Sequence, residues 1–309
     1  MEANPVLRRL GLSSGDRAVI IHADDLGMCQ ATLLGLEELL EAGVVSSGAI
    51  MVPCPWFRAA ARFAAEHPRA DLGVHLTLTS EWKTYRWGPV STSDPASGLL
   101  DGEGYFPATA RAVQETADPA AVAREIEVQI ARAAAAGIAL THADTHMGAV
   151  ASARFMESYV NAALRHGLPP MLPRLDEDGW RALSRDHAGG SLDGEAIRRV
   201  MALTTSLEGR GVPLIDGLTG LPLSSDPAGR LEEAKTALAG LKPGVTHFII
   251  HPARDTPELR AITADWACRA ADHATFASRE LRQFIRDQGI HVIGYRKLQE
   301  SMRSAQGAP

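Results

Sequence analysis

Cysteine, excess positive charge and long apolar runs are all scarce in this chain of 309 residues. Its three cysteines, Cys29, Cys54 and Cys268, are too few and too scattered for a disulfide framework or a cysteine zinc site. A formal net charge of −6 and a pI near 6.0 argue against nucleic acid or an anionic membrane surface as a partner. No apolar stretch approaches the roughly 18 residues that cross a bilayer, and the N-terminus lacks the apolar segment of a signal peptide. We therefore expect a soluble cytoplasmic protein.

Strand-like segments alternate with helix-like segments along most of the chain, and 45% of the residues are hydrophobic, enough for a full-sized core. The expected strands are 17–22, 47–52, 72–78, 138–142, 246–251 and 291–294. Short strands between amphipathic helices predict a largely parallel sheet of the α/β class, either a barrel or a doubly wound sheet. The chain has no internal repeat and no low-complexity linker, so we expect a single domain over residues 1–309.

Several helix boundaries carry clear signals. One predicted helix stops at Gly43, and another has Asp118 as its N-cap and Pro119 at its first position. The one long irregular stretch is 80–117, which is rich in glycine, proline, serine and aromatic residues. Loops of this length in compact domains are usually functional or partly mobile.

Histidines gather at the C-terminal ends of the predicted strands. Five of the eleven lie at or just past such an end: His22, His75, His142, His146 and His251. Parallel βα architectures build their active sites at this edge, because the βα loops converge there. One histidine in such a place is most often structural, but five of them beside Asp24 and Asp25 are hard to explain by packing. The pattern predicts a functional site at this edge.

Two segments supply the clearest spacing. In "THADTH", His142, Asp144 and His146 leave the same face of an extended chain. Imidazole is the commonest metal ligand, and an aspartate between two histidines can orient one ring through its second nitrogen. In "GVHLTLT", His75 lies on the polar face of its strand together with Thr77. A structural polar cluster is the alternative interpretation of both segments.

The adjacent acids Asp24 and Asp25 follow the first predicted strand. Two uncompensated carboxylates would repel each other, and the pKa of one would rise. A divalent cation removes this conflict, because one carboxylate ligates it while the other stays free as a base. The alternative is a helix N-cap, which accounts for only one acid. One carboxylate with two imidazoles is typical of a catalytic metal site, since it leaves positions open for water and substrate. Such a site indicates a hydrolase.

The blocks "HADDLGM", "VSSGAIMV", "LGVHLTLT", "THADTHMG" and "IIHPARD" together resemble the YdjC-like carbohydrate deacetylases, a family that includes chitooligosaccharide deacetylase. They span about residues 17 to 255 in the family's order. The resemblance implies a distorted (β/α) barrel that removes an N-acetyl group from an amino sugar or short oligosaccharide. The sequence departs from the family at His22, where asparagine is usual, at Leu26, where phenylalanine is usual, and at Met147 and Gly148, where further histidines follow. These departures keep the implied ligands and bear on the identity of the substrate.

The resemblance also implies roles for individual residues. Asp25, His75 and His146 would hold one divalent metal, with magnesium implied by the family and zinc or another transition metal as alternatives. Asp24 would be the base on the water that the metal activates. His251 would lie near the sugar or the leaving group and act as a general acid. The alternative is that its ring is hydrogen-bonded into the wall of the barrel and has no catalytic role.

The remaining expectations concern the substrate. We expect His22, His142 and Trp82 to contact it, and Asp144, together with His142, to orient the metal ligands from behind. The rings of the irregular stretch either stack on sugars or anchor the loop: Trp82, Tyr85, Trp87, Tyr105 and Phe106. The expected partner is a small-molecule or oligosaccharide substrate, and a homodimer is left open. The alternative functions are hydrolysis of another amide or ester and non-catalytic sugar binding, against which the retained Asp24 argues.

Overall fold

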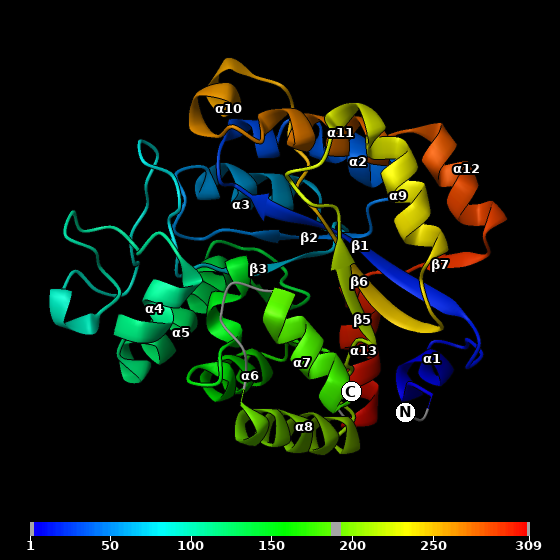
Figure 1. The fold of residues 1–309 in the computed structure, drawn as a ribbon, viewed down its shortest axis with the longest axis horizontal. Coiled ribbons are helices and arrows are strands. Elements are labelled where there is room, and N and C mark those ends of the chain that lie inside the picture. The colour runs from blue at the N-terminus through cyan, green and yellow to red at the C-terminus, as the bar shows by residue number, and fades with distance from the viewer. Residues whose placement is uncertain (1–2, 187–192, 308–309) are drawn as a thin grey trace.

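Seven parallel strands form the centre of the computed structural model, which describes residues 3–186 and 193–307 (Figure 1). The strands are β1 Arg17–Leu26, β2 Ser47–Ile50, β3 Leu72–Leu76, β4 Ala143–Thr145, β5 Gly217–Gly220, β6 Gly244–Ile250 and β7 Ile290–Val292. Their order is β4-β3-β2-β1-β6-β5, and β7 pairs with the first residues of β1. Within the described residues every strand pair is parallel, as the alternation of strands and helices predicted.

The two edges of the sheet are joined by the segment 170–173. Pro170 forms an isolated parallel bridge to Ala143 in β4, and Pro173 forms another to Ile215, two residues before β5. The sheet therefore curves round to close on itself, with a sparse seam at residues 170–173 in place of a regular strand. This arrangement confirms the expected α/β class and distorted barrel with parallel strands.

Helices surround the sheet (Figure 1). They are α1 Pro5–Arg9, α2 Leu36–Ala42, α3 Phe57–Glu66, α4 Ala110–Thr116, α5 Pro119–Ala135, α6 Met156–Arg165, α7 Glu177–Asp186, α8 Gly194–Gly209, α9 Arg230–Ala239, α10 Pro257–Ile262, α11 Trp266–Phe276, α12 Arg279–Asp287 and α13 Tyr295–Ala305. The predicted boundary signals are confirmed. Asp118 accepts a hydrogen bond from the amide of Ala121 at the start of α5, and Gly43 ends α2 with a φ of 69°.

Alternate side chains of β1 point to opposite faces of the strand, so this one strand supplies residues both to the hydrophobic core and to the candidate site. Val19 and Ile21 pack with the main hydrophobic cluster, whereas Ala18 and Ile20 belong to a second cluster with residues of α1, β6 and α13. Each fully buried isoleucine contributes roughly 1.5–3 kcal/mol to the free energy of unfolding. Side chains alternate with a period of two, so His22 continues the face of Ala18 and Ile20.

Three sequence expectations about strands need correction. The strand predicted at 138–142 is observed as β4 at Ala143–Thr145, although the amide of Thr141 already donates to the carbonyl of Leu72 in β3. β5 was missed, because a four-residue segment bounded by glycines and only partly buried has little hydrophobic pattern. β1 extends beyond His22 to Leu26, since the site residues themselves continue the strand.

Candidate metal centre at the barrel mouth

The ends of β1, β3 and β4 bring three predicted metal ligands together. Oδ1 of Asp25 lies 3.5 Å from Nε2 of His75 and 3.2 Å from Nδ1 of His146. One ligand atom from each residue lies within 4.8 Å of the others, and all three side chains are buried. Neighbouring parallel strands end at the same edge of the sheet, so residues 50 to 121 positions apart in the chain meet here.

A distortion of β1 lets both adjacent acids reach the mouth. The pairing of β1 with β2 shifts register between Ala23 and Leu26, and Asp25 has a φ of 62°. In a regular strand, neighbouring side chains point to opposite faces. The left-handed conformation, which aspartate tolerates better than most residues, turns Asp25 towards the same site as Asp24.

The carboxylate of Asp25 has one oxygen paired and one unpaired. Arg269 in α11 donates from Nη1 to Oδ2 over 2.7 Å. Oδ1 is buried and has no hydrogen-bond partner among the described residues. Burial by itself raises the pKa of Asp25, but the Arg269 guanidinium and the rings of His146 and His75 outweigh it and hold the pKa well below its usual range. An ionised, buried oxygen without a hydrogen bond needs positive charge in front of it, either as protons on the rings of His75 and His146 or as a cation in their place.

In each of the two histidines, the ring nitrogen that points away from Asp25 contacts a carboxylate. Nδ1 of His75 donates to Oδ1 of Asp144 over 2.9 Å, which leaves Nε2 facing Asp25. Nε2 of His146 lies 3.3 Å from Oε2 of Glu81, which leaves Nδ1 facing Asp25. Such outer carboxylates fix the tautomer and orientation of metal-binding imidazoles. Asp144 therefore lies where the sequence placed it, whereas Glu81 was not foreseen.

The same carboxylates affect the protonation of the two rings. Burial lowers the pKa of His146, but Glu81 and Asp25 raise it to about 9. Burial likewise lowers the pKa of His75, and the carboxylates of Asp144 and Asp24 raise it well above its usual range. The site thus attracts positive charge strongly, whether as protons on the rings or as a metal ion in their place.

The spacing and chemistry of the donor atoms fit a divalent ion. Two ligand atoms about 2.1 Å from an ion are about 3.0 Å apart at a right angle and about 3.4 Å apart at the tetrahedral angle. The observed separations of 3.5 Å and 3.2 Å from Oδ1 of Asp25 fall in or near this range. One carboxylate and two imidazoles suit magnesium, zinc and other divalent ions.

Asp24 lies beside this cluster without joining it. Its Oδ1 is 2.6 Å from Nδ1 of His22, and its Oδ2 is 3.8 Å from Nε2 of His75. Burial raises the pKa of Asp24, but the nearby rings of His75 and His22 outweigh this and hold it below its usual value. Asp24 also lines the cavity described next, so its carboxylate is placed to accept a proton there.

A cavity of about 640 Å³ covers the barrel mouth. Its polar end holds Asp24, Asp25, Glu81, His146, His251 and Arg269. The cavity is also lined by Met171, Leu172 and Pro173 from the seam, by Leu218 from β5 and by Trp180 from α7. This volume suits a small molecule or a short oligosaccharide.

His251 directly follows β6 and lines the cavity. Its backbone amide donates to Oδ2 of Asp272 over 2.9 Å, which fixes the chain at this point. Nδ1 of the ring is buried and finds no partner in the described part of the chain. Burial lowers the pKa of His251, so its ring is neutral at pH 7. The ring thus has a free polar atom near the site.

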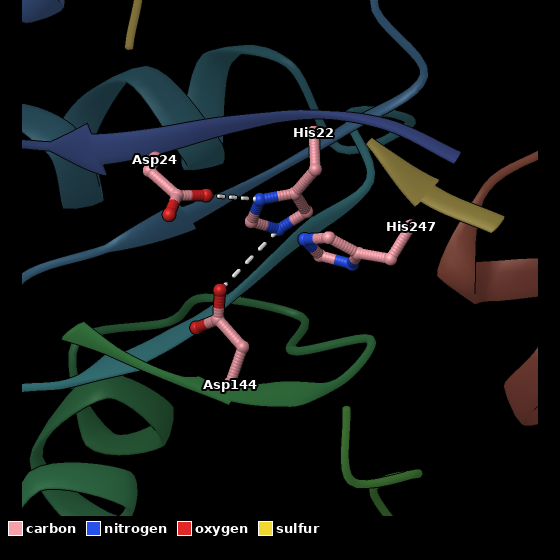
Figure 2. Close-up of side chains that lie close together, drawn as sticks. All are labelled: His22, Asp24, Asp144 and His247. Carbon is pink, nitrogen blue, oxygen red and sulfur yellow. Dashed lines mark hydrogen bonds and ion pairs between the residues drawn. The ribbon is translucent and has the colours of Figure 1, made fainter. Parts of the chain in front are cut away.

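Two residues expected to contact the substrate lie elsewhere. His22 and His142 have no exposed surface, and neither is among the described residues that line the cavity. His22 lies between Asp24 and Asp144, with His247 tilted against it at a ring distance of 4.6 Å (Figure 2). The inward face of β1 points into the barrel rather than out of its mouth, so these rings are behind the site and out of reach of a substrate.

The aromatic residues of the irregular stretch divide between two positions. Trp82 lines the cavity. Trp87 is buried and donates from Nε1 to the carbonyl of Thr79 over 2.7 Å, and Tyr85 donates to the carbonyl of Met28 over 2.6 Å. Phe106 is buried as well, whereas Tyr105 is 38% exposed. Of these five aromatic side chains, Trp82 is the one that lines the cavity, and Trp87 anchors the loop.

The fold and site define an α/β barrel with a candidate metal centre at its mouth. The chain belongs to the YdjC-like protein family, which matches residues 18–287. It is 32% identical over 311 aligned residues to a carbohydrate deacetylase of Thermus thermophilus, covering 96% of this chain and 99% of the relative. It is 35% identical over 288 residues to a carbohydrate deacetylase of Brevibacillus brevis, covering 91% and 99%.

A crystal structure from Enterococcus faecalis shows the same fold. That protein, described as a putative cellobiose-phosphate cleavage protein, aligns with a TM-score of 0.70 and 22% identity, over 92% of this chain and 99% of its own. No helix in the described ranges is long and apolar enough to cross a membrane.

Proposed function

We propose that this protein is a metal-dependent hydrolase that removes an N-acetyl group from an amino sugar or a short oligosaccharide. The observation that carries the proposal is the unpaired Oδ1 of Asp25, which faces two imidazole nitrogens that are each supported by a carboxylate. The names of the relatives, carbohydrate deacetylases, support the same reaction class.

Asp25, His75 and His146 would hold one divalent ion, with magnesium favoured by the family and zinc as the alternative. When bound, the ion would polarise the acetyl carbonyl and increase the acidity of water at the site. Arg269 keeps Asp25 ionised and fixed through its bond to Oδ2, while Asp144 and Glu81 hold the two rings in the required orientation.

Amide hydrolysis requires two proton transfers. The oxygen of water bonds to the carbonyl carbon and loses a proton, then the C–N bond breaks and the amine nitrogen gains a proton. Asp24 accepts the first proton, because its carboxylate is ionised, lines the cavity and is adjacent to the metal ligands. His251 lines the same cavity and would lie near the leaving group; the second proton would come from the protonated Asp24, either directly or through the neutral ring of His251, which takes up one proton as it gives one.

The cavity supports the proposed substrate class. Trp82 offers an aromatic face beside the polar end, and aromatic rings suit the C–H faces of sugars. The volume of about 640 Å³ accommodates an amino sugar with a further group attached. The experiment is acetate release from a panel of N-acetylated sugars and acetyl esters, with and without a chelator. We expect release from an N-acetyl sugar that stops with chelator and returns with added metal. Metal-independent release, or release from esters alone, would contradict the proposal.

A further inference from the structure

The cavity residue His251 is fixed in the structure through its backbone. Nδ1 of its ring is buried and has no hydrogen-bond partner among the described residues. Its backbone amide, in contrast, donates to Oδ2 of Asp272 in α11 over 2.9 Å. The next residue is Pro252, which has no amide hydrogen, so the chain cannot donate again before Ala253. The position of the His251 ring therefore depends on the bond between its amide and Asp272.

The helix α11 also holds the other side of the site. Three residues before Asp272, Arg269 donates from Nη1 to Oδ2 of Asp25 over 2.7 Å. The backbone carbonyl of Arg269 accepts from the amide of Ala253, two residues after His251, over 3.1 Å. Residues three positions apart lie on the same face of a helix. One face of α11 therefore carries both the side chain that fixes the proposed metal ligand Asp25 and the side chain that fixes His251.

Arg230, the first residue of α9, holds the carboxylate of Asp272 in place, and α9 packs against α11 (Figure 1). Nε of Arg230 donates to Oδ1 of Asp272 over 2.6 Å, and the two side chains are 1% and 0% exposed. The same guanidinium donates from Nη1 to the carbonyl of Pro222, two residues after β5, over 2.7 Å, and to Oε2 of Glu233 over 3.1 Å. One oxygen of Asp272 is thus anchored, and the other is directed at the amide of His251.

We propose that Asp272 is a positioning residue, which fixes His251 relative to Asp25 through the backbone amide of His251. Arg230 supports this role by holding the second oxygen of the carboxylate. The inference rests on the proposed function, in which His251 lies near the leaving group. Asp272 is not among the described residues that line the cavity, so it acts on the reaction through another residue. The effect can be large, because a displacement of about 1 Å in a reacting geometry can cost about 10²-fold in rate.

Asp272→Asn tests this role without removing the side chain. An amide has a single acceptor oxygen, so asparagine can accept at the position of Oδ1 or at that of Oδ2, but not at both. We expect kcat for acetate release to fall roughly tenfold, with KM and metal content little changed. The matched control is Glu233→Gln, because Glu233 accepts from the same guanidinium, whereas the amide of His251 bonds to Asp272. We expect the control to retain its kcat.

A double-mutant cycle separates positioning from a general structural role. His251→Ala removes the ring and keeps the backbone amide, so Asp272→Asn should lower kcat no further in this background. Its effect on the free energy of unfolding should be the same in both backgrounds. Full kcat in Asp272→Asn, or a loss that persists in the His251→Ala background, would overturn the proposal. If Asp272→Asn does not fold, Arg230→Lys, which keeps the charge and loses the Nε bond, takes its place in the same cycle with the same expected pattern.

The bond itself is measured without turnover, by amide hydrogen exchange in ¹⁵N-histidine-labelled protein loaded with Mg²⁺ or Zn²⁺. The His251 signal is assigned by its loss in His251→Ala. We expect its amide to exchange slowly in the wild type and in Glu233→Gln, and at least about tenfold faster in Asp272→Asn. An unchanged exchange rate in Asp272→Asn would overturn the inference. If the wild-type protein releases no acetate from any substrate, the proposed function fails, while the exchange rates still decide whether Asp272 fixes His251.

Discussion

Removal of the Glu81 carboxylate tests whether the histidines of the site are held ready for a metal. Glu81 lies 3.3 Å from Nε2 of His146, and its side chain is 21% exposed. Outer carboxylates of this kind are worth about 10- to 100-fold in metal affinity. The contact is long and partly hydrated, so we expect the lower end for Glu81→Ala, about tenfold or roughly 1.4 kcal/mol of binding free energy. Glu81→Gln, which keeps a neutral acceptor, should lose less.

The assay is isothermal titration calorimetry of metal-free protein with Mg²⁺ or Zn²⁺. The control is Glu103→Gln, because Glu103 lies in the same irregular stretch, is 73% exposed and has only a distant ion pair with Arg86 at 3.9 Å. We expect the control to bind as tightly as the wild type. An unchanged dissociation constant in Glu81→Ala would refute the view that Glu81 prepares His146 for a metal.

Further predictions concern catalysis, the loop and pH. Asp24→Asn should keep the fold and bound metal but lose at least about 10² in turnover, and near-normal activity would refute its role as base. His251→Ala should lower kcat and leave metal content intact, whereas full kcat would assign both proton transfers to Asp24. Trp87→Ala should destabilise the protein by roughly 3–5 kcal/mol in denaturant unfolding, while Trp82→Ala should chiefly raise KM, and the reverse result would exchange their roles.

His67 tests the electrostatics at a distance from the site. Its ring lies 3.1 Å from Glu37, and this hydrogen bond, with one to the carbonyl of Phe63, raises the pKa of His67. The stabilisation is present while the ring is protonated, below its unfolded pKa of about 6.5, and is lost as pH rises through the higher folded pKa. Glu37→Gln should therefore lower the free energy of unfolding by a few tenths of a kcal/mol at pH 6 and leave it unchanged at pH 9. An equal loss at both pH values would show that the charge is not responsible.

The parts of the site that depend on strand periodicity could be predicted from the sequence. The ends of β1, β3 and β4 place Asp25, His75 and His146 at one edge because parallel strands share their direction. The i, i+2 spacing suggested that Asp144 orients a histidine of its own segment, whereas the structure shows it bonded to His75 on the neighbouring strand. The single-domain assignment stays a prediction.

The parts that depend on long-range contacts could not be predicted. Arg269 meets Asp25 across 244 positions of sequence, and nothing in the sequence of α11 distinguishes it from other helical arginines. Glu81 reaches His146 from an irregular loop, where no periodicity indicates the direction of a side chain. His22 and His142 were expected to face the substrate because they lie at strand ends, but the inward face of a closed barrel directs them below its mouth.

The seam at residues 170–173 is an irregular part of the barrel that also lines the cavity. The proposed metal ligands lie in or directly after β1, β3 and β4, which are paired in parallel ladders that are regular apart from the register shift at Asp25. Met171 and Leu172 of the seam line the same cavity, and the seam is joined to Ala143 in β4 and to Ile215 by two isolated bridges. Substitutions of Met171 and Leu172 would change the shape of the cavity without replacing a proposed ligand. If the proposed function holds, the seam is therefore where a redesign for another acetylated sugar should begin.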